Sequence, residues 1–239
     1  MQTLKLSDSS KVINLKKEYL LKKENIARRL QDFDRFYNEP YSWFFNNNKM
    51  ELRKVSKNHD ERLFEELCFC ILTANTSAEM GLRSIDRIRH LLLDGSAEEM
   101  SKNLEGIYRF PNIRPGFIVS TREFLKNSHN FELKKIIETM KHDPSALREF
   151  FVQNVKGFAY KESSHFLRNV SLKGYGILDK HIINSMIEFG IVDEVKMPLN
   201  KERYEELESK LKMFSNEIGI PMDELDLLLW SRKNGKIMK

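Results

Sequence analysis

The sequence has few of the residues that build cross-linked or metal-bound scaffolds. It holds two cysteines, Cys68 and Cys70, in 239 residues. An i, i+2 pair inside an apolar run suits neither a disulfide nor a closed zinc site, and an iron–sulfur cluster would need about four thiolates. The two cysteines are therefore interpreted as small hydrophobic residues of a buried helix, and no iron–sulfur cluster is expected.

The chain is also poor in helix breakers and long apolar runs. Only 10 Gly and 6 Pro stand beside 40 Lys+Arg and 35 Asp+Glu, a balance that predicts helices with solvated outer faces. No alternation of β-branched residues indicates a sheet, and residues 46–48 read as a loop. No apolar stretch reaches the roughly 18 residues of a membrane span, and residues 1–23 are too charged for a secretory signal. We expect an all-α, soluble, intracellular (cytoplasmic) protein with no membrane partner.

The charge balance points weakly toward a polyanionic partner. The formal net charge is +5, and lysine and arginine release counterions from nucleic-acid phosphates. This excess is modest for 239 residues, so charge alone does not identify a DNA-binding protein.

Residues 146–170 carry the pattern of a tight helical hairpin. A predicted helix stops at Gly157, and another starts within about three residues of it. Gly157 lets the backbone turn closely, so that amides at the start of the second helix can point at a phosphate. Lys161 then falls in the first helical turn, where the helix dipole disfavours the ammonium form and helps to release a nucleophilic amine. By spacing alone, an ordinary surface lysine is the commoner interpretation.

Two acidic residues and a tryptophan are candidates for further chemistry. Asp179 directly precedes a predicted helix, so it reads as an N-cap, a role that is compatible with catalysis at the helix entrance. Asp226 and Trp230 are spaced i, i+4 on one face of another predicted helix. By spacing alone, a solvated helix charge and a core aromatic are the commoner interpretations of this pair.

At this point the sequence resembles a known family. Residues 158–170 and 177–182 look like the helix-hairpin-helix DNA glycosylases, and in detail like the second, mainly prokaryotic family of 8-oxoguanine DNA glycosylase/AP lyases. The segments 66–75, 225–230 and 235–239 match the same family in the right order. The likeness covers about residues 60–239. It departs from the superfamily pattern at Ala159, where a second hairpin glycine is usual.

The resemblance implies a two-lobed helical fold with the active site in the cleft between the lobes. Residues 1–59 would form a basic extension and helices packing with the C-terminal lobe. Residues 60–177 would form a helical barrel lobe ending in the hairpin at about 146–170, and residues 178–239 would complete the lesion pocket.

The resemblance also implies a bifunctional reaction. Lys161 would attack C1′ of a flipped-out 8-oxoguanine nucleotide, displace the base and form a Schiff base that eliminates the 3′ phosphate. Asp179 would stabilise the positive charge that develops on the sugar. Because a glycosylase without the lysine cuts only the base–sugar bond, Lys161 predicts lyase activity as well.

The other expected site residues fall into three groups, and no cofactor is required. The base pocket would use Asp226, Trp230, Lys239 and His165. His165 could instead be a packing residue of the core. Arg109 and Phe110 would fill the gap left by the flipped base and contact the orphaned cytosine. Gly157 and Ala159 would approach a DNA phosphate, and the carbonyls of Gln153, Val155 and Phe158 would hold a structural Na⁺ or K⁺.

The expected partner is double-stranded DNA with 8-oxoguanine opposite cytosine, bound by a monomer. Two alternatives stay open. A monofunctional glycosylase for alkylated, deaminated or mismatched bases is disfavoured by Lys161. A non-catalytic helix-hairpin-helix DNA-binding module needs neither Lys161, nor Asp179, nor the Asp226 and Trp230 pair.

Overall fold

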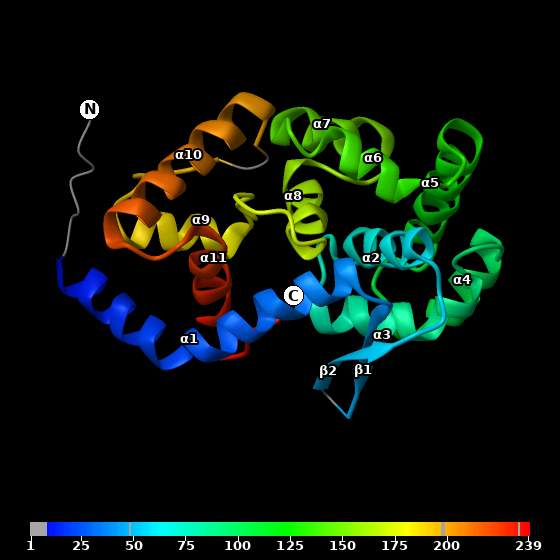
Figure 1. The fold of residues 1–239 in the computed structure, drawn as a ribbon, viewed down its shortest axis with the longest axis horizontal. Coiled ribbons are helices and arrows are strands. Elements are labelled where there is room, and N and C mark those ends of the chain that lie inside the picture. Colours follow the sequence, from blue (N-terminus) through cyan, green and yellow to red (C-terminus); the bar gives the residue numbers. More distant parts are fainter. Residues whose placement is uncertain (1–8, 48, 197–198, 234) are drawn as a thin grey trace. The chain divides into compact units, whose positions relative to one another are not determined.

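The computed structural model describes residues 9–47, 49–196, 199–233 and 235–239 (Figure 1). Its elements in chain order are α1 (Ser9–Asn38), β1 (Tyr41–Asn46), β2 (Lys49–Lys54), α2 (His59–Thr73), α3 (Ala78–Ile88), the 3₁₀ helix η1 (Arg89–Leu91), α4 (Ala97–Leu104), α5 (Arg114–His129), α6 (Leu133–Met140), α7 (Pro144–Asn154), α8 (Tyr160–Asn169), α9 (Lys180–Glu188), α10 (Lys201–Ile218) and α11 (Met222–Ser231). The expectation of a mainly helical fold is confirmed.

The antiparallel pair β1 and β2 is a correction to the all-helical expectation. The strands pair with Tyr41 opposite Lys54 and Asn46 opposite Lys49. Only β1 is aromatic, while β2 is mostly charged, so the sequence shows no matching alternation. Trp43 is 2% exposed, and its ring lies 6.0 Å from that of Phe33 on α1. Packing on a helix therefore stabilises a hairpin that strand propensity does not predict.

The chain divides into two compact units. The terminal unit contains Met1–Gln31 and Lys173–Lys239, and the central unit contains Asp32–Leu172. Residues 32–59 fall in the central unit, where strand β1 contacts helix α3. Residues 1–8 and Asn48, which belong to the predicted extension and loop, lie outside the described residues.

Helix α2 is the hub of the central unit. Every residue from Arg62 to Thr73 is buried, and the helix contacts α3, α5, α6 and α8. A helix that is buried on all sides has this central place. Asn58 caps its start by accepting the Glu61 backbone N–H at 2.8 Å. Cys68 and Cys70 are buried free thiols, as the sequence predicts, and burial raises the pKa of the Cys68 thiol well above its ordinary value.

In the terminal unit, the first part of α1 bonds to the C-terminal segment. Tyr19 donates its hydroxyl hydrogen bond to Glu224 Oε2 at 2.5 Å, and Lys22 Nζ lies 2.9 Å from Ser231 Oγ. Arg29 donates to the Ile237 carbonyl at 3.3 Å. The N-terminal helix is thus fastened to α11 and to the residues that follow it.

Candidate functional site

The predicted hairpin is formed by α7 and α8 with the segment 155–159 between them. Gly157 has φ +88°, a left-handed conformation that side chains rarely adopt. A Cβ at this position would lie 2.5 Å from Phe117 Cδ2 and 2.8 Å from Arg114 Nη1. Glycine is therefore required at position 157 both for the backbone turn and for the close approach of two side chains.

Ala159 occupies the N-cap of α8 in extended backbone, with φ −120° and ψ −171°. Any residue adopts this conformation, so the turn does not need a second glycine. The Ala159 backbone N–H donates to Glu162 Oε2 at 3.2 Å, which satisfies one of the free amides at the helix start. The departure from the superfamily pattern is compatible with the hairpin.

Lys161 is the second residue of α8 and lies in the first turn, as predicted. Its side chain is 24% exposed, so the amine is accessible from solvent. Glu162 Oε1 lies 3.6 Å from Lys161 Nζ. The Lys161 amine therefore lies at the start of α8, next to the turn between α7 and α8.

Asp179 is the N-cap of α9, as the sequence predicts, and its carboxylate is held by three hydrogen bonds. Oδ1 accepts the backbone N–H groups of His181 at 2.8 Å and Ile182 at 2.9 Å. Oδ2 accepts the indole Nε1–H of Trp230 at 2.9 Å. The three donors fix the orientation of the carboxylate, which is the property needed in a group that stabilises charge without moving.

Asp226 and Trp230 both contact the segment 177–179. Asp226 is 2% exposed, and its Oδ1 accepts the Ile177 backbone N–H at 3.2 Å. It is neither a solvated helix charge nor an open acceptor at that oxygen. Trp230 is half-buried and bonds to Asp179. Both residues therefore support the 177–179 segment, a link between distant residues that spacing along one helix cannot show.

Two further pocket candidates are buried. Lys239 is 3% exposed, and Arg29 contacts the chain two residues before it, at the Ile237 carbonyl. His165 is 7% exposed, and its ring lies edge-on to Phe69 with the centroids 5.7 Å apart. The surroundings of His165 fit the packing alternative stated for it.

Arg109 and Phe110 lie in the loop between α4 and α5. The Phe110 ring is edge-on to the Tyr108 ring, with the two centroids 6.3 Å apart. The guanidinium of Arg109 lies 5.1 Å from the centroid of Phe110. Ile113 is the most exposed large apolar residue of this loop, with 54% of its surface accessible. Sequence analysis did not single out Ile113, because an isoleucine next to a helix start ordinarily belongs to the core.

The candidate residues group by unit. The central unit holds Arg109, Phe110, Gln153, Val155, Gly157, Phe158, Ala159, Lys161 and His165, and the terminal unit holds Asp179, Asp226, Trp230 and Lys239. Within the hairpin, the Val155 carbonyl accepts the Phe158 N–H at 3.1 Å.

Among the described residues, no cluster of three His, Cys, Asp or Glu side chains could hold a metal ion. In the same part of the chain, none of the helices has the length and apolar character that a membrane span needs.

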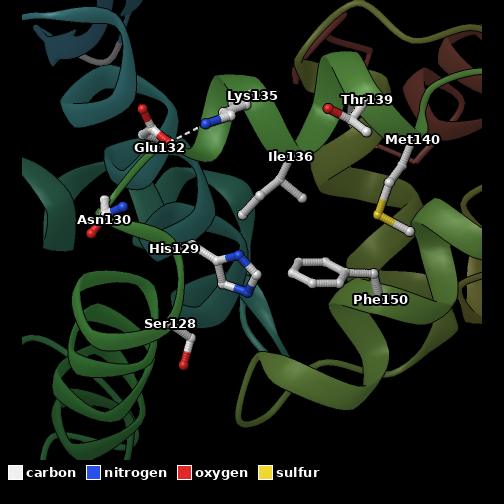
Figure 2. Close-up of a pocket in the computed structure, with 9 residues that line it drawn as sticks. All are labelled: Ser128, His129, Asn130, Glu132, Lys135, Ile136, Thr139, Met140 and Phe150. Carbon is white, nitrogen blue, oxygen red and sulfur yellow. Dashed lines mark hydrogen bonds and ion pairs between the residues drawn. The ribbon is translucent and has the colours of Figure 1, made fainter.

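A pocket of about 360 Å³ in the central unit lies between the end of α5, α6 and α7 (Figure 2). The rings of His129 and Phe150 meet edge-on at 5.5 Å, and Lys135 pairs with Glu132 at 2.9 Å on its rim. None of the predicted site residues lines it. This pocket is therefore separate from the candidate site.

Comparisons with known proteins identify a family that this chain resembles. The family described as 8-oxoguanine DNA glycosylase matches residues 45–220. An 8-oxoguanine DNA glycosylase/AP lyase of Korarchaeum cryptofilum is 38% identical over 218 residues, 91% of each chain. That of Methanocaldococcus jannaschii is 38% identical over 190 residues, 79% of this chain and 88% of the other.

Two solved structures are similar over nearly the whole chain. The 8-oxoguanine DNA glycosylase of Thermotoga maritima gives a TM-score of 0.79 at 32% identity, covering 96% of this chain and 99% of that one. The Methanocaldococcus jannaschii glycosylase/lyase, in complex with a 15mer DNA containing 8-oxoguanine, gives 0.78 at 34% identity, covering 95% and 100%.

Proposed function

The chain belongs to the 8-oxoguanine DNA glycosylase family, and we propose that it excises 8-oxoguanine from DNA and then cuts the strand at the resulting abasic site. The observation that carries this proposal is the accessible amine of Lys161 in the first turn of the second hairpin helix. A non-catalytic hairpin module needs no such amine, and a monofunctional glycosylase would use water in its place.

Lys161 supplies the nucleophile. Its neutral amine forms a bond to C1′ while the N-glycosidic bond breaks, and the base leaves with the bonding electrons and takes up a proton. The amine then loses its proton, the C1′–O4′ bond breaks and O4′ takes up a proton, which opens the sugar ring and gives a Schiff base between Nζ and C1′. Removal of a proton from C2′ expels the 3′ phosphate and breaks the strand by β-elimination.

Asp179 stabilises the positive charge that the sugar develops as the base departs. A carboxylate held by three donors needs no reorganisation when the charge appears, and this lowers the barrier. We assign Trp230 the task of holding Asp179 Oδ2. We assign Asp226 the task of holding the backbone at Ile177 just before it.

The base itself is recognised by contacts that distinguish its oxidised ring. Oxidation at C8 turns N7 from an acceptor into a donor, so the pocket must offer an acceptor there. We propose that a main-chain oxygen of Lys239 supplies this acceptor and that the half-buried ring of Trp230 lies against the base. His165 lies one turn after Lys161 and supports α8 by packing on Phe69.

DNA is held by the hairpin and by the α4–α5 loop. Backbone amides near Gly157 and Ala159 approach a phosphate, while Arg109 and Phe110 enter the gap opposite the cytosine. We propose that the carbonyls of Gln153, Val155 and Phe158 hold Na⁺ or K⁺, because backbone oxygens near the negative end of α7 favour a cation. Such an ion would be structural. We propose that the enzyme acts as a monomer on lesion-bearing duplex inside the cell.

An end-labelled duplex with 8-oxoguanine opposite cytosine tests this proposal. The expected result is strand cleavage without alkali, with an unsaturated sugar left at the 3′ end. Cleavage that appears only after hot alkali would show a monofunctional enzyme. Binding that ignores the lesion and gives no excision under either condition would show a DNA-binding module.

A further inference from the structure

Two cations share one aromatic ring beside the hairpin loop. The guanidinium of Arg114 lies 5.3 Å from the centroid of Phe117, and Lys156 Nζ lies 5.7 Å from the same centroid. We call these three residues the Phe117 platform. Arg114 also lies 5.8 Å from the ring of Phe110, which connects the platform to the α4–α5 loop.

The platform is part of the hairpin surface. Lys156 directly precedes Gly157, and Arg114 Nη1 lies 2.8 Å from the place that a Cβ of residue 157 would occupy. The absence of a side chain at Gly157 thus makes room for the guanidinium. Lys156 is exposed and Arg114 is partly exposed, so both charged groups are accessible to a ligand.

The two cations lack the acidic partner that comparable arginines have. Within the described ranges, neither Arg114 nor Lys156 forms an ion pair. Arg83 also lies over a ring, at 5.4 Å from Phe45, but it is paired with Glu79 at 2.7 Å. Two positive groups on one ring repel each other, and the ring quadrupole offsets that repulsion only in part. An anion placed between them would be stabilised by both.

We propose that Arg114 and Lys156 together bind one backbone phosphate of duplex DNA, next to the phosphate approached by the hairpin amides. This inference rests on the proposed function, because it takes DNA as the ligand. The arginine fork suits two phosphate oxygens, and lysine adds a point charge. The contact is independent of sequence and of the lesion, so it serves to place the hairpin on undamaged DNA as well.

The test is the salt dependence of binding to an undamaged duplex by wild type, Arg114→Gln, Lys156→Gln and the double variant. Each phosphate contact contributes about 0.9 to the slope of log K against log salt concentration. One shared phosphate predicts a slope reduced by about 0.9 in the double variant. Each single variant should change the slope less, because the other cation still holds the phosphate. Arg83→Gln is the matched control, a ring-stacked arginine already neutralised by Glu79, and should leave the slope unchanged.

A double variant with the wild-type slope would overturn the platform, provided that its thermal melting shows a folded protein. A loss of about 1.8 would contradict one shared phosphate and indicate two separate contacts. Incision of lesion-bearing duplex by the wild type is measured in parallel. Failure of incision would reject the proposed function, whereas an unchanged slope with normal incision would reject the platform alone.

Discussion

Trp230 donates its indole hydrogen bond to Asp179 Oδ2 at 2.9 Å, although the two residues stand 51 positions apart. The bond completes the set of three donors on this carboxylate. It gives Trp230 a role that can be separated from stacking on a base, because a phenylalanine keeps a ring but has no indole N–H.

Trp230→Phe is expected to slow excision of 8-oxoguanine about 10- to 100-fold, since a hydrogen bond to a charged group contributes about 1.5–3 kcal/mol. The measurement is the single-turnover rate at saturating lesion duplex. Lesion affinity should change less than the rate, because the aromatic face remains. Excision at the wild-type rate would show that Trp230 acts on the base alone and does not support Asp179.

Two neighbouring substitutions in the turn between α7 and α8 are expected to differ in their effect on the free energy of unfolding. Gly157→Ala is expected to cost about 1–3 kcal/mol of unfolding free energy, because φ is +88° and the methyl group would meet Phe117 at 2.5 Å. Ala159→Gly should change stability by less than about 0.5 kcal/mol, since position 159 is already extended. Urea unfolding of both variants checks this. Equal stability of the two variants would contradict the assigned turn.

Tyr19→Phe should lower the free energy of unfolding by about 1 kcal/mol, because it removes the hydrogen bond from α1 to Glu224 of α11. Burial, with a smaller contribution from Glu224, raises the pKa of Tyr19 to about 12. This folded-state pKa lies above the ordinary 10.0, so the contribution is present below pH 10 and is lost as pH rises toward 12. Denaturant unfolding at pH 7 and pH 11 measures both effects. Tyr19→Phe with wild-type stability at pH 7 would contradict the contact.

His59 should make the protein less stable in mild acid. Burial and the nearby Arg62 and Lys134 lower the pKa of His59 from 6.5 to about 4, although Asp60 and Glu138 act in the opposite direction. The folded state therefore disfavours the imidazolium, and stability that is present above pH 6.5 is lost as pH falls toward 4. His59→Phe keeps an edge contact with Tyr37 and should show a flatter fall in unfolding free energy between pH 7 and pH 4.5. Identical pH profiles would contradict this role.

The parts of the site that sequence could predict obey local rules. Gly157, the first-turn position of Lys161 and the N-cap at Asp179 all follow from residue preferences within one or two helical turns. The mainly helical fold follows in the same way, from charged residues and few breakers. The resemblance supplied the chemistry that these positions alone left open.

The remaining features depend on contacts between distant segments. The bond from Ile177 to Asp226 and that from Trp230 to Asp179 each join residues about fifty positions apart. The β-hairpin depends on Trp43 packing against Phe33, and the Phe117 platform depends on α5 meeting the hairpin loop. Helical periodicity identifies which residues share a face, but it does not identify the partner across a fold.

Borohydride trapping on duplex bearing 8-oxoguanine opposite cytosine tests the central role of Lys161 most directly. Reduction of the Schiff base should give a covalent protein–DNA adduct with wild type and with Lys141→Gln, a control lysine paired to Glu138 at 2.5 Å. Lys161→Gln should give none while still binding the duplex. An adduct of wild-type yield from Lys161→Gln, or no adduct from an excising wild-type enzyme, would contradict the account.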